Sequence, residues 1–321
     1  MGGVNAWNGL LCVNKEAGFT SNDVVAKLRG ILKQKKIGHT GTLDPEAVGV
    51  LVVCLGNATR VVDLLTEHSK EYIAVVQLGV VTDTQDMTGE ILEKRDTSGV
   101  TRERLTEALQ AFKGSYEQVP PMYSAVKVNG QRLYKLAREG KTVERKPRTV
   151  TIDAISLLDD SLLSESGIFT MEVRCSKGTY IRTLCNDIGE RLDCGAAMAM
   201  LTRTAVGSFR LESALTLTQI EEQRDAGTLA DAILPVEELF RDMDRITVSE
   251  DFRRRLENGN SLGPEMIVSE APADENDSVP PEESFTDNEA VRVYCGGEWF
   301  GIYRYSAKLK QFRVDKFFRE T

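Results

Sequence analysis

Hydrophobic positions recur along the chain with two periods, which separate predicted strands from predicted helices. Continuous or alternating apolar runs predict strands at residues 9–14, 50–55, 70–80 and 168–175. Apolar residues spaced three or four apart are typical of helices, and these are expected at residues 21–32, 58–65, 101–112, 179–192 and 217–226. A linking segment follows at residues 233–239. Beyond it, a helix at 249–257 and strands at 291–294, 299–305 and 312–317 predict a smaller β-rich module.

Two of the predicted helices carry capping signals at their starts. Ser21, with Asp23 in the first turn, is predicted to cap the helix at 21–32. Gly178 provides the turn before the helix at 179–192, and Thr179 is a candidate cap for it. Tyr180 and Arg182 then fall in the first turn of that helix, near its positive end.

A polar stretch between two predicted elements has neither helical nor strand periodicity. Residues 38–45 read Gly-His-Thr-Gly-Thr-Leu-Asp-Pro, which predicts a constrained loop. Pro45 disfavours helical backbone at Asp44, so the acid is expected in an extended conformation that presents its side chain. On the residues alone two interpretations stay open: Asp44 caps its own backbone in a turn, or it is a reactive acid that the loop holds in place.

Residues 118–150 form a long basic insertion in which Lys and Arg residues are interleaved with tyrosines. Such a surface suits contact with an RNA backbone while aromatic rings stack on bases. A solvated face of helix and loop is the alternative interpretation.

The chain has 321 residues, which exceeds one typical domain, so we predict a main body of residues 1–245 and a second module of residues 246–321. The net charge is −9, which by itself disfavours a nucleic-acid partner. However, residues 264–290 hold nine acids and no base, and removing these nine from the 49 acids leaves 40, equal to the 40 bases. RNA binding is therefore not excluded, although non-specific electrostatic binding over the whole surface is disfavoured.

The acidic segment 264–290 has too few apolar residues to fold by itself. Between residues 270 and 288 it contains two large apolar side chains, Val279 and Phe285, and three prolines. Because this cannot offset the entropy of ordering the chain, we predict a disordered acidic loop inside the second module.

Composition also restricts the cell compartment and the cofactors. No apolar stretch approaches the length of a membrane span, and the N-terminus lacks a basic region followed by an apolar one. The six cysteines are scattered and form no Cys-x-x-Cys pair, which is typical of reduced thiols in the cytoplasm. Only two histidines exist, His39 and His68, so a His-rich metal site is not expected.

Several separate motifs between about residues 8 and 215 resemble one known family. They are Val-Asn-Lys-Glu-Ala-Gly-Phe-Thr-Ser at 13–21, Lys-Lys-Ile-Gly-His-Thr-Gly-Thr-Leu-Asp-Pro at 35–45, Gly-Val-Leu at 49–51, Gly-Asn-Ala-Thr-Arg at 56–60, Pro-Pro-Met-Tyr-Ser-Ala-Val-Lys at 120–127 and Leu-Thr-Arg-Thr-Ala-Val-Gly-Ser-Phe at 201–209. In this order they closely resemble the bacterial tRNA pseudouridine-55 synthases of the TruB family. One departure is visible: the family usually has Lys-Pro where this chain has Lys15-Glu16.

The resemblance implies an α+β catalytic domain built on a mixed, largely antiparallel curved sheet, followed by a small PUA-like RNA-binding domain. It implies that the enzyme isomerises uridine to pseudouridine in the T loop of tRNA after flipping the base out, and that it acts as a monomer. The partner would be the T-arm stem-loop of tRNA, contacted by the insertion at 118–150, and no metal, nucleotide or organic cofactor is expected.

The resemblance also assigns roles to individual residues. Asp44 would be the nucleophile and Arg182 its counter-ion. Tyr72 would stack on the uracil and take the proton from its carbon. Tyr180 and Leu201 would complete the uridine pocket, and His39 would fill the gap that the flipped nucleotide leaves.

Two other functions stay open at this point. One is a pseudouridine synthase that acts on another RNA uridine. The other is a protein that binds or folds tRNA without essential catalysis, against which the joint presence of Asp44, Tyr72 and Arg182 argues.

Overall fold

The computed structural model describes residues 7–128, 130–268 and 285–318. Within these residues, ten strands form one large sheet and five strands form a small one. The strands of the large sheet are β1 (Gly9–Lys15), β2 (Ile37–His39), β3 (Val48–Leu55), β4 (Lys70–Leu78), β7 (Gly114–Gln118), β10 (Arg148–Asp159), β11 (Ile168–Cys175), β12 (Ala196–Val206), β13 (Phe209–Arg210) and β14 (Ile233–Leu234). Those of the small sheet are β15 (Arg245–Val248), β16 (Ile267–Val268), β17 (Ala290–Cys295), β18 (Glu298–Ser306) and β19 (Gln311–Phe317).

Helices and two short hairpins complete the described structure. The helices are α1 (Ser21–Ile31), α2 (Val62–Thr66), α3 (Arg102–Gln110), α4 (Leu133–Arg138), α5 (Leu163–Ser166), α6 (Ile181–Arg191), α7 (Leu217–Ala226) and α8 (Arg253–Glu257). Short 3-10 helices include η1 (Gly56–Val61), η4 (Val236–Phe240) and η5 (Glu250–Phe252). The hairpins pair β5 (Val80–Thr82) with β6 (Ile91–Lys94), and β8 (Lys127–Val128) with β9 (Gln131–Arg132).

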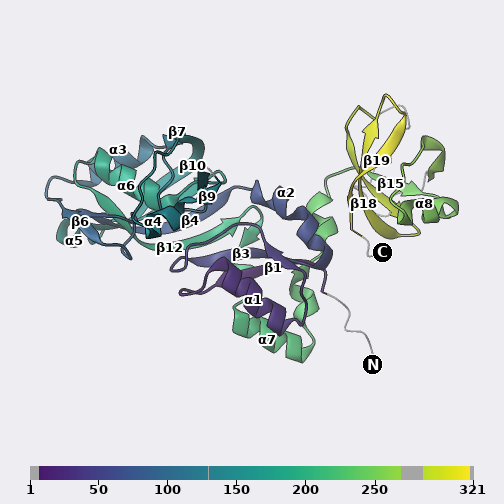
Figure 1. Cartoon of the computed structure of the whole chain (residues 1–321), viewed down its shortest axis with the longest axis horizontal. Coiled ribbons are helices and arrows are strands. Elements are labelled where there is room, and N and C mark those ends of the chain that lie inside the picture. Colours follow the sequence, from purple (N-terminus) through teal and green to yellow (C-terminus); the bar gives the residue numbers. More distant parts are fainter. Residues whose placement is uncertain (1–6, 129, 269–284, 319–321) are drawn as a thin grey trace.

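The large sheet is mixed and mostly antiparallel, which confirms the predicted α+β class. Its strand order is β14-β1-β3-β12-β4-β11-β10-β7, with β2 beside β3 and β13 beside β12. The pair of β3 and β12 is parallel, and the other neighbours in this sheet are antiparallel. The sheet crosses the middle of the molecule, with α1 and α7 packed near β1 and β3, and with α3 and α6 at the other end (Figure 1).

The two ends of this sheet differ in how many faces are covered. Alternate residues of β3 pack into different cores: Leu51, Val53 and Leu55 against α1 and α7, and Val50, Val52 and Cys54 against η1 and the small sheet. In β4 only one face is fully buried, because its burial alternates from residue to residue. Burial on both faces explains the continuous apolar run at 50–55, and burial on one face explains the alternation at 70–78.

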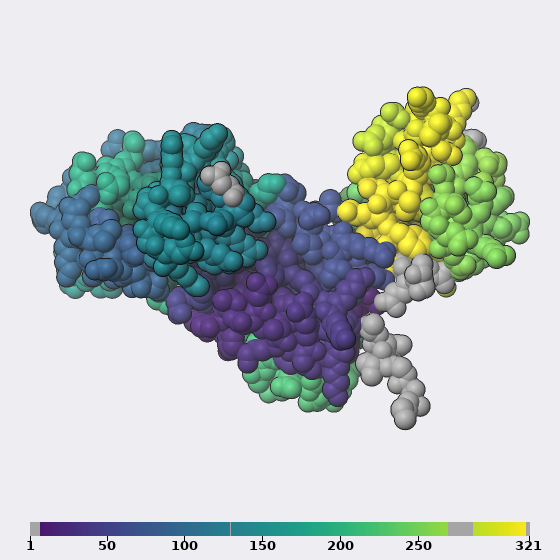
Figure 2. All heavy atoms as spheres, viewed as in Figure 1, coloured from purple at the N-terminus to yellow at the C-terminus, as the bar shows by residue number. Residues whose placement is uncertain are grey.

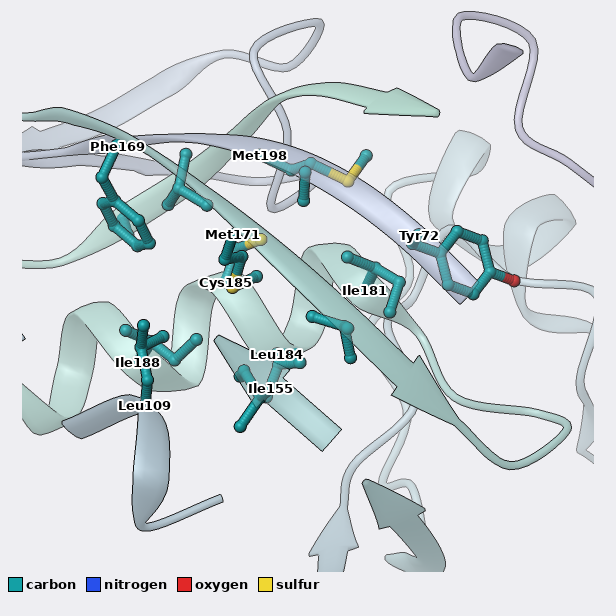
Figure 3. Close-up of a cluster of buried hydrophobic side chains, with 14 of the residues drawn as sticks. Tyr72, Leu109, Ile155, Phe169, Met171, Ile181, Leu184, Cys185, Ile188 and Met198 are labelled. Atoms are coloured by element: carbon teal, nitrogen blue, oxygen red, sulfur yellow. The ribbon is translucent and has the colours of Figure 1, made fainter. Parts of the chain in front are cut away.

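A third core lies between α3, α6 and the strands β4, β10, β11 and β12. Figure 3 shows its side chains, with Leu184 and Ile188 of α6 facing Met171 and Phe169 of β11. Tyr72 stands at the end of this row, and its hydroxyl group points away from the apolar side chains (Figure 3). The apolar core therefore ends at a polar atom, which marks one wall of the candidate site described below.

Both predicted capping residues are wrong. The N-cap of α1 is Thr20, whose hydroxyl group accepts from the backbone N–H of Asp23, while Ser21 lies inside the helix. The helix α6 begins at Ile181 with Tyr180 as its N-cap residue, and the Tyr180 side chain makes no capping hydrogen bond. Thr179 instead donates its hydroxyl to the Ser176 carbonyl oxygen, so it stabilises the preceding turn.

Several element boundaries also differ from the predictions. The segment 58–65 is the 3-10 helix η1 followed by α2, and 249–257 is η5 followed by α8. The strand expected at 70–80 ends at Leu78, because Gly79 has a positive φ of 80° that turns the chain into β5. The long strands β10 and β12 were not predicted.

The small sheet has its own apolar core and also contacts the main body. Its order is β16-β15-β17-β18-β19. Trp299 stacks on Phe318 with ring centroids 4.6 Å apart, and both pack near Phe240 of η4. The amide group of Asn57 in η1 donates to the Phe318 carbonyl oxygen at 2.7 Å. These contacts join the end of β19 to the start of η1.

Most of the predicted disordered acidic loop, residues 269–284, lies outside the described residues. Both of its predicted limits were wrong. Pro264–Met266 form a 3-10 helix and Ile267–Val268 form β16, while Phe285 packs on Phe312 and Tyr305 at centroid distances of 5.0 and 5.8 Å. The backbone N–H of Asn288 also donates to the Tyr305 carbonyl oxygen at 2.8 Å. Residues 285–290 therefore belong to the small sheet's structure.

Candidate active site

The loop that carries Asp44 connects β2 to β3 and is fixed at both ends by buried side chains. The ammonium group of Lys15 donates to the carbonyl oxygens of Glu16, Phe19 and Pro45 at 3.0, 2.6 and 2.8 Å. The Ser21 hydroxyl accepts from the Leu43 backbone N–H at 2.9 Å. The lysine side chain is fully buried, and burial lowers its pKa to about 8, while the charges of Glu46 and Asp44 oppose the shift. A buried cation is thus used to hold the loop.

A second buried cation, Arg203 of β12, holds the other side of the same loop. Its Nη2 and Nη1 atoms donate to the carbonyl oxygens of Gly41 and Thr42 at 3.2 and 3.4 Å. Its Nε atom donates to the Val50 carbonyl oxygen of β3 at 2.7 Å. The loop backbone is therefore hydrogen-bonded to both β1 and β12, which gives the Asp44 side chain a defined position.

The carboxylate of Asp44 faces Arg182 of α6. Their closest contact, Nη2 to Oδ2, is 3.4 Å, and the same nitrogen lies 3.5 Å from Oδ1. Among the described residues, this carboxylate accepts hydrogen bonds from Arg182 and none from the loop backbone. The interpretation in which Asp44 caps its own turn is therefore wrong. Asp44 keeps 40% of its side-chain surface exposed, whereas Arg182 keeps 7%. The pair is open on the side of the acid.

Arg182 is held in place by two further groups. Its Nη2 donates to the Tyr123 carbonyl oxygen at 2.6 Å, and its Nη1 lies 3.7 Å from Oδ2 of Asp86. The other oxygen of Asp86 accepts from Thr84 Oγ1 at 2.8 Å and from the Thr88 backbone N–H at 3.0 Å. One guanidinium group therefore links two acids and the basic insertion.

The protonation of Asp44 reflects opposing effects. Burial raises the pKa of this carboxyl above its usual range, the guanidinium of Arg182 lowers it, the nearby charge of Asp86 raises it and that of Lys15 lowers it. The acid thus combines partial exposure with a local environment that disfavours its charge. The arrangement suits a carboxylate that is only partly stabilised by its counter-ion.

Tyr72 and Leu201 lie on the neighbouring strands β4 and β12. Both are buried in the same core cluster as Leu43 of the Asp44 loop. Burial raises the pKa of the Tyr72 hydroxyl, while the charge of Arg203 lowers this pKa. The proximity of the Asp44 charge raises it further, so the acid and the phenol lie in one electrostatic neighbourhood.

Tyr180 stands at the start of α6, where Gln118 fixes it. The Tyr180 backbone N–H donates to Gln118 Oε1 at 2.8 Å, and Gln118 Nε2 donates back to the Tyr180 carbonyl oxygen at 3.0 Å. The Tyr180 ring lies beside the Arg182 guanidinium, 5.9 Å from centroid to Cζ. Gln118 therefore positions the first turn of α6, and with it Arg182.

His39 is the last residue of β2, immediately before the loop. Burial and the charge of Arg203 lower the pKa of its imidazole, and a hydrogen bond to the Gly41 backbone opposes the shift. Three polar atoms at or next to the site are buried without a hydrogen-bond partner in the described structure: His39 Nδ1, Ser124 Oγ and Arg182 Nε. Buried polar groups are normally satisfied, so these atoms are candidates for contacts with a substrate.

Of the six predicted site residues, five converge. Asp44, Arg182 and Tyr180 contact one another in series, and Tyr72 and Leu201 share the adjoining cluster. His39 lies at the end of β2, before the loop, where the charge of Arg203 affects its pKa. Sequence reasoning missed Lys15, Asp86 and Arg203. The signal for Asp86 is the run Thr-Asp-Thr-Gln-Asp-Met-Thr-Gly at 82–89, which is rich in turn-forming residues.

The basic insertion lies next to this site and exposes its charges. Arg132 and Arg138 flank the half-buried Tyr134 ring at 5.9 and 5.6 Å from its centroid. Arg145 donates to the Pro120 carbonyl oxygen at 3.0 Å, which ties the end of the insertion to its start. The described residues contain no group of three or more His, Cys, Asp or Glu placed to hold a metal ion. None of the described helices is both long and apolar enough to cross a membrane.

Two family models match most of the main body. The TruB family pseudouridylate synthase N-terminal domain matches residues 29–181, and the tRNA pseudouridylate synthase B C-terminal domain matches residues 182–241. The tRNA pseudouridine synthase B of Lachnoclostridium phytofermentans is 50% identical over 97% of this chain and 99% of its own length. That of Staphylococcus haemolyticus is 44% identical over 89% of this chain and 93% of its own length.

Solved structures support the same fold. A crystal structure of a Cbf5-Nop10-Gar1 complex contains a chain that aligns with a TM-score of 0.66 and 25% identity, covering 97% of this chain and 85% of that chain. A chain of an H/ACA ribonucleoprotein bound to a substrate RNA containing 2'-deoxyuridine aligns with the same TM-score at 23% identity and the same coverage. The architecture seen here thus recurs in known proteins over nearly the whole chain.

Proposed function

We propose that this chain, which belongs to the TruB family of pseudouridylate synthases, converts the uridine at position 55 in the T loop of tRNA into pseudouridine. That it is an isomerase that forms pseudouridine in tRNA follows from its identity of 44–50% to tRNA pseudouridine synthases over most of its length. The position in the T loop and the residues that act there are the proposed part. We expect it to act in the cytoplasm, as a monomer and without a metal or organic cofactor.

The observation that carries the proposal is the pair of Asp44 and Arg182. The carboxylate is exposed on one side, lies 3.4 Å from a buried guanidinium, and is held by a loop that two buried cations fix. A planar guanidinium both neutralises and orients a carboxylate, which a single ammonium does less well. Such a group is prepared to react with an electron-poor atom that enters from the open side.

The reaction explains why a carboxylate is needed. Detaching uracil from the ribose leaves the sugar carbon poor in electrons. Asp44 then traps that carbon, adds to the pyrimidine ring, or removes a sugar proton, and these three routes stay open. One acid suffices, in contrast to the carboxylate pair of glycosidases, because the uracil stays bound and is rejoined through carbon.

The other site residues form the proposed pocket around the base. Tyr72 stacks on the uracil, and its side-chain oxygen, in the deprotonated form, takes the proton from the carbon that has formed the new bond and becomes a neutral phenol. Tyr180 and Leu201 complete the pocket from α6 and β12. His39 occupies the space that the flipped nucleotide leaves in the RNA. The buried, unpartnered Nδ1 of His39 and Nε of Arg182 support contacts with a substrate.

Two surfaces are proposed to bind the rest of the tRNA. The insertion at 118–150 would hold the T arm through its exposed bases and Tyr134. The small sheet would act as a PUA-like RNA-binding domain. Figure 2 shows the surface indented between the teal lobe, which carries the basic insertion, and the small sheet, which leaves space above the main body for an RNA stem.

The test combines one substitution with mapping of the modified nucleotide. Asp44→Asn is nearly isosteric and removes the nucleophilic charge, so we expect no pseudouridine in an unmodified tRNA transcript and tRNA binding within several-fold of wild type. Asp231→Asn, at an exposed acid in the 3-10 helix Leu229–Ala232 that follows α7, is the matched control and should remain active. Wild-type turnover by Asp44→Asn would reject the nucleophile assignment.

The same experiment separates the rival functions. Pseudouridine at another uridine of the transcript, with position 55 unmodified, would favour a different RNA target. Binding and refolding of tRNA by the wild-type protein, without any pseudouridine, would favour a tRNA-folding role.

A further inference from the structure

We propose that Arg203 is a positioning residue for pseudouridine formation, holding the Asp44 loop and the Tyr72 hydroxyl in a single arrangement. The inference rests on the roles proposed above for Asp44 and Tyr72. It concerns a side chain that lies behind both groups, in β12, and that acts through them.

The first argument is the set of atoms that Arg203 binds. The side chain is 2% exposed, and within the described structure its hydrogen bonds go to the main-chain carbonyl oxygens of Gly41, Thr42 and Val50. Among the described ion pairs, none joins Arg203 to a carboxylate. A buried cation without an acidic partner is costly, so its retention needs a specific benefit, which here is control of the backbone on either side of Asp44.

The second argument is the register between β12 and β4. Arg203 lies directly opposite Tyr72 in this antiparallel pair. Residues directly opposite project from the same face with Cβ atoms about 4.5–5.5 Å apart. The charge of Arg203 also opposes the effect of burial on the pKa of the Tyr72 hydroxyl. One side chain therefore binds the loop of the acid and lies opposite the phenol on the neighbouring strand.

The third argument is the place of Arg203 in the sheet. It lies at the parallel junction of β3 and β12, where its own partner in the register is Gly49 of β3. The Asp44 loop enters β3 at this junction. The guanidinium group thus binds the loop where β3 and β12 are hydrogen-bonded to each other. The loop is therefore held by the sheet, which limits the movement of Asp44.

Shape distinguishes Arg203 from a general buried charge. The three acceptors belong to two different segments, the loop and β3, and a planar fork of five N–H donors reaches them together. An ammonium group keeps the charge, but its donors all lie on one nitrogen atom and cannot reach all three acceptors at once. Arg203→Lys should therefore retain the charge and lose the simultaneous contacts.

The experiment measures Arg203→Lys in the full-length protein under single-turnover conditions with saturating enzyme and a tRNA transcript. We expect the rate of pseudouridine formation to fall by about a hundredfold, the cost of a small misplacement of reacting groups, while the Kd for tRNA stays within several-fold. Arg224→Lys is the control, because Arg224 of α7 also donates through its guanidinium group to a main-chain carbonyl, that of Ile31 at 2.6 Å, and belongs to neither the proposed site nor the proposed RNA-binding surfaces. It should lower the melting temperature and leave the single-turnover rate unchanged.

Two further measurements separate positioning from a loss of stability. In a cycle with Tyr72→Phe, the penalty for losing the hydroxyl should be clearly smaller in the Arg203→Lys background, because that hydroxyl is already misplaced. Tyrosine labelled with ¹³C at Cζ gives a resonance for Tyr72, assigned by its loss in Tyr72→Phe. This resonance should move in Arg203→Lys and stay in place in Arg224→Lys.

The inference fails if folded Arg203→Lys reacts at the wild-type rate, if the two substitutions multiply independently, or if the Tyr72 resonance does not move. These failures differ from a failure of the proposed function. That outcome would appear as an active Asp44→Asn, whatever Arg203→Lys does.

Discussion

Asp44 is subject to two demands that a single residue type has to reconcile. The reaction needs a charged carboxylate, yet burial of the site raises the pKa of this group. Arg182 and Lys15 oppose the shift through their positive charges, and Asp86 reinforces it through its negative charge. Burial and the neighbouring charges thus act on the protonation of this acid in opposite directions.

This balance predicts the acid side of the pH–rate profile. Because the pKa of Asp44 is raised above 3.8, the single-turnover rate should fall on acidification at a higher pH than for an ordinary aspartate. Asp86→Asn removes the acid that raises this pKa and that shares Arg182, so it should move the midpoint to lower pH. Rates measured from pH 4 upward in both proteins test this. A midpoint that is unchanged by Asp86→Asn would contradict the coupling.

At the scale of residues, the sequence indicated the groups that face the proposed substrate but not the groups that hold them in place. Asp44 stands out because it lies in a loop without periodicity. Lys15 and Arg203 lie within the family motifs at 13–21 and 201–209, but their roles could not be predicted because their partners are backbone carbonyls, which have no signature in the sequence. Asp86 reaches Arg182 only through a turn between β5 and β6, a contact that sequence spacing does not encode.

At the scale of elements, periodicity succeeded where the strands are regular. The apolar runs of β3 and β4 predicted the strand positions correctly because the burial pattern of each strand is regular. β3 is buried on both faces, and β4 is buried on alternate residues. In β10 and β12, bulges shift the register, at Met198/Met200 and Arg203/Ala205 in β12, and the apolar residues then change faces. Alternation is lost at each bulge, so these strands could not be recognised from their pattern.

The junction of the Asp44 loop with β3 depends on Gly49. This residue has a φ of +103°, and a Cβ atom placed there would lie 2.3 Å from the Arg203 carbonyl oxygen, a backbone atom that cannot move aside. Gly49→Ala should therefore destabilise the protein by at least about 1–3 kcal/mol, the cost of a disfavoured backbone conformation alone. A fall of at least about 2 °C in the melting temperature is expected.

Gly30 in α1 provides the matched control for this substitution. A Cβ atom there meets nothing within 4 Å, and the site is exposed in a helix. Gly30→Ala should raise the stability by about 0.5–1 kcal/mol, because alanine is the better helix former. Equal melting temperatures for Gly49→Ala and the wild type would show that the junction tolerates a side chain.

At the scale of the whole molecule, the small sheet is joined to the loop-bearing half of the main body. Asn57 donates to the Phe318 carbonyl oxygen and accepts from the Lys36 ammonium group, both at 2.7 Å. Lys36 precedes β2, which leads into the Asp44 loop. The Gly-Asn-Ala-Thr-Arg motif at 56–60 therefore connects the end of the chain with the strand before the site, a role that its sequence alone did not indicate.

The acidic segment between β16 and β17 carries the final prediction. Residues 270–284 contain six acids and no base, in a chain that is otherwise close to neutral. Replacing them by a short Gly-Ser linker should leave catalysis intact, because loop-closure entropy changes by only about 0.6 kcal/mol per doubling of length. The replacement stops before Phe285, whose ring packs on Phe312.

If the acids repel RNA, tRNA binding should become tighter at low salt, and the gain should vanish as the Debye length falls from about 30 Å at 0.01 M to about 3 Å at 1 M. A full-length variant with the same acids changed to Asn and Gln separates charge from length and should match the linker variant. Equal affinities at every salt concentration would reject repulsion, and loss of folding in the linker variant would show that the segment is needed for the small sheet.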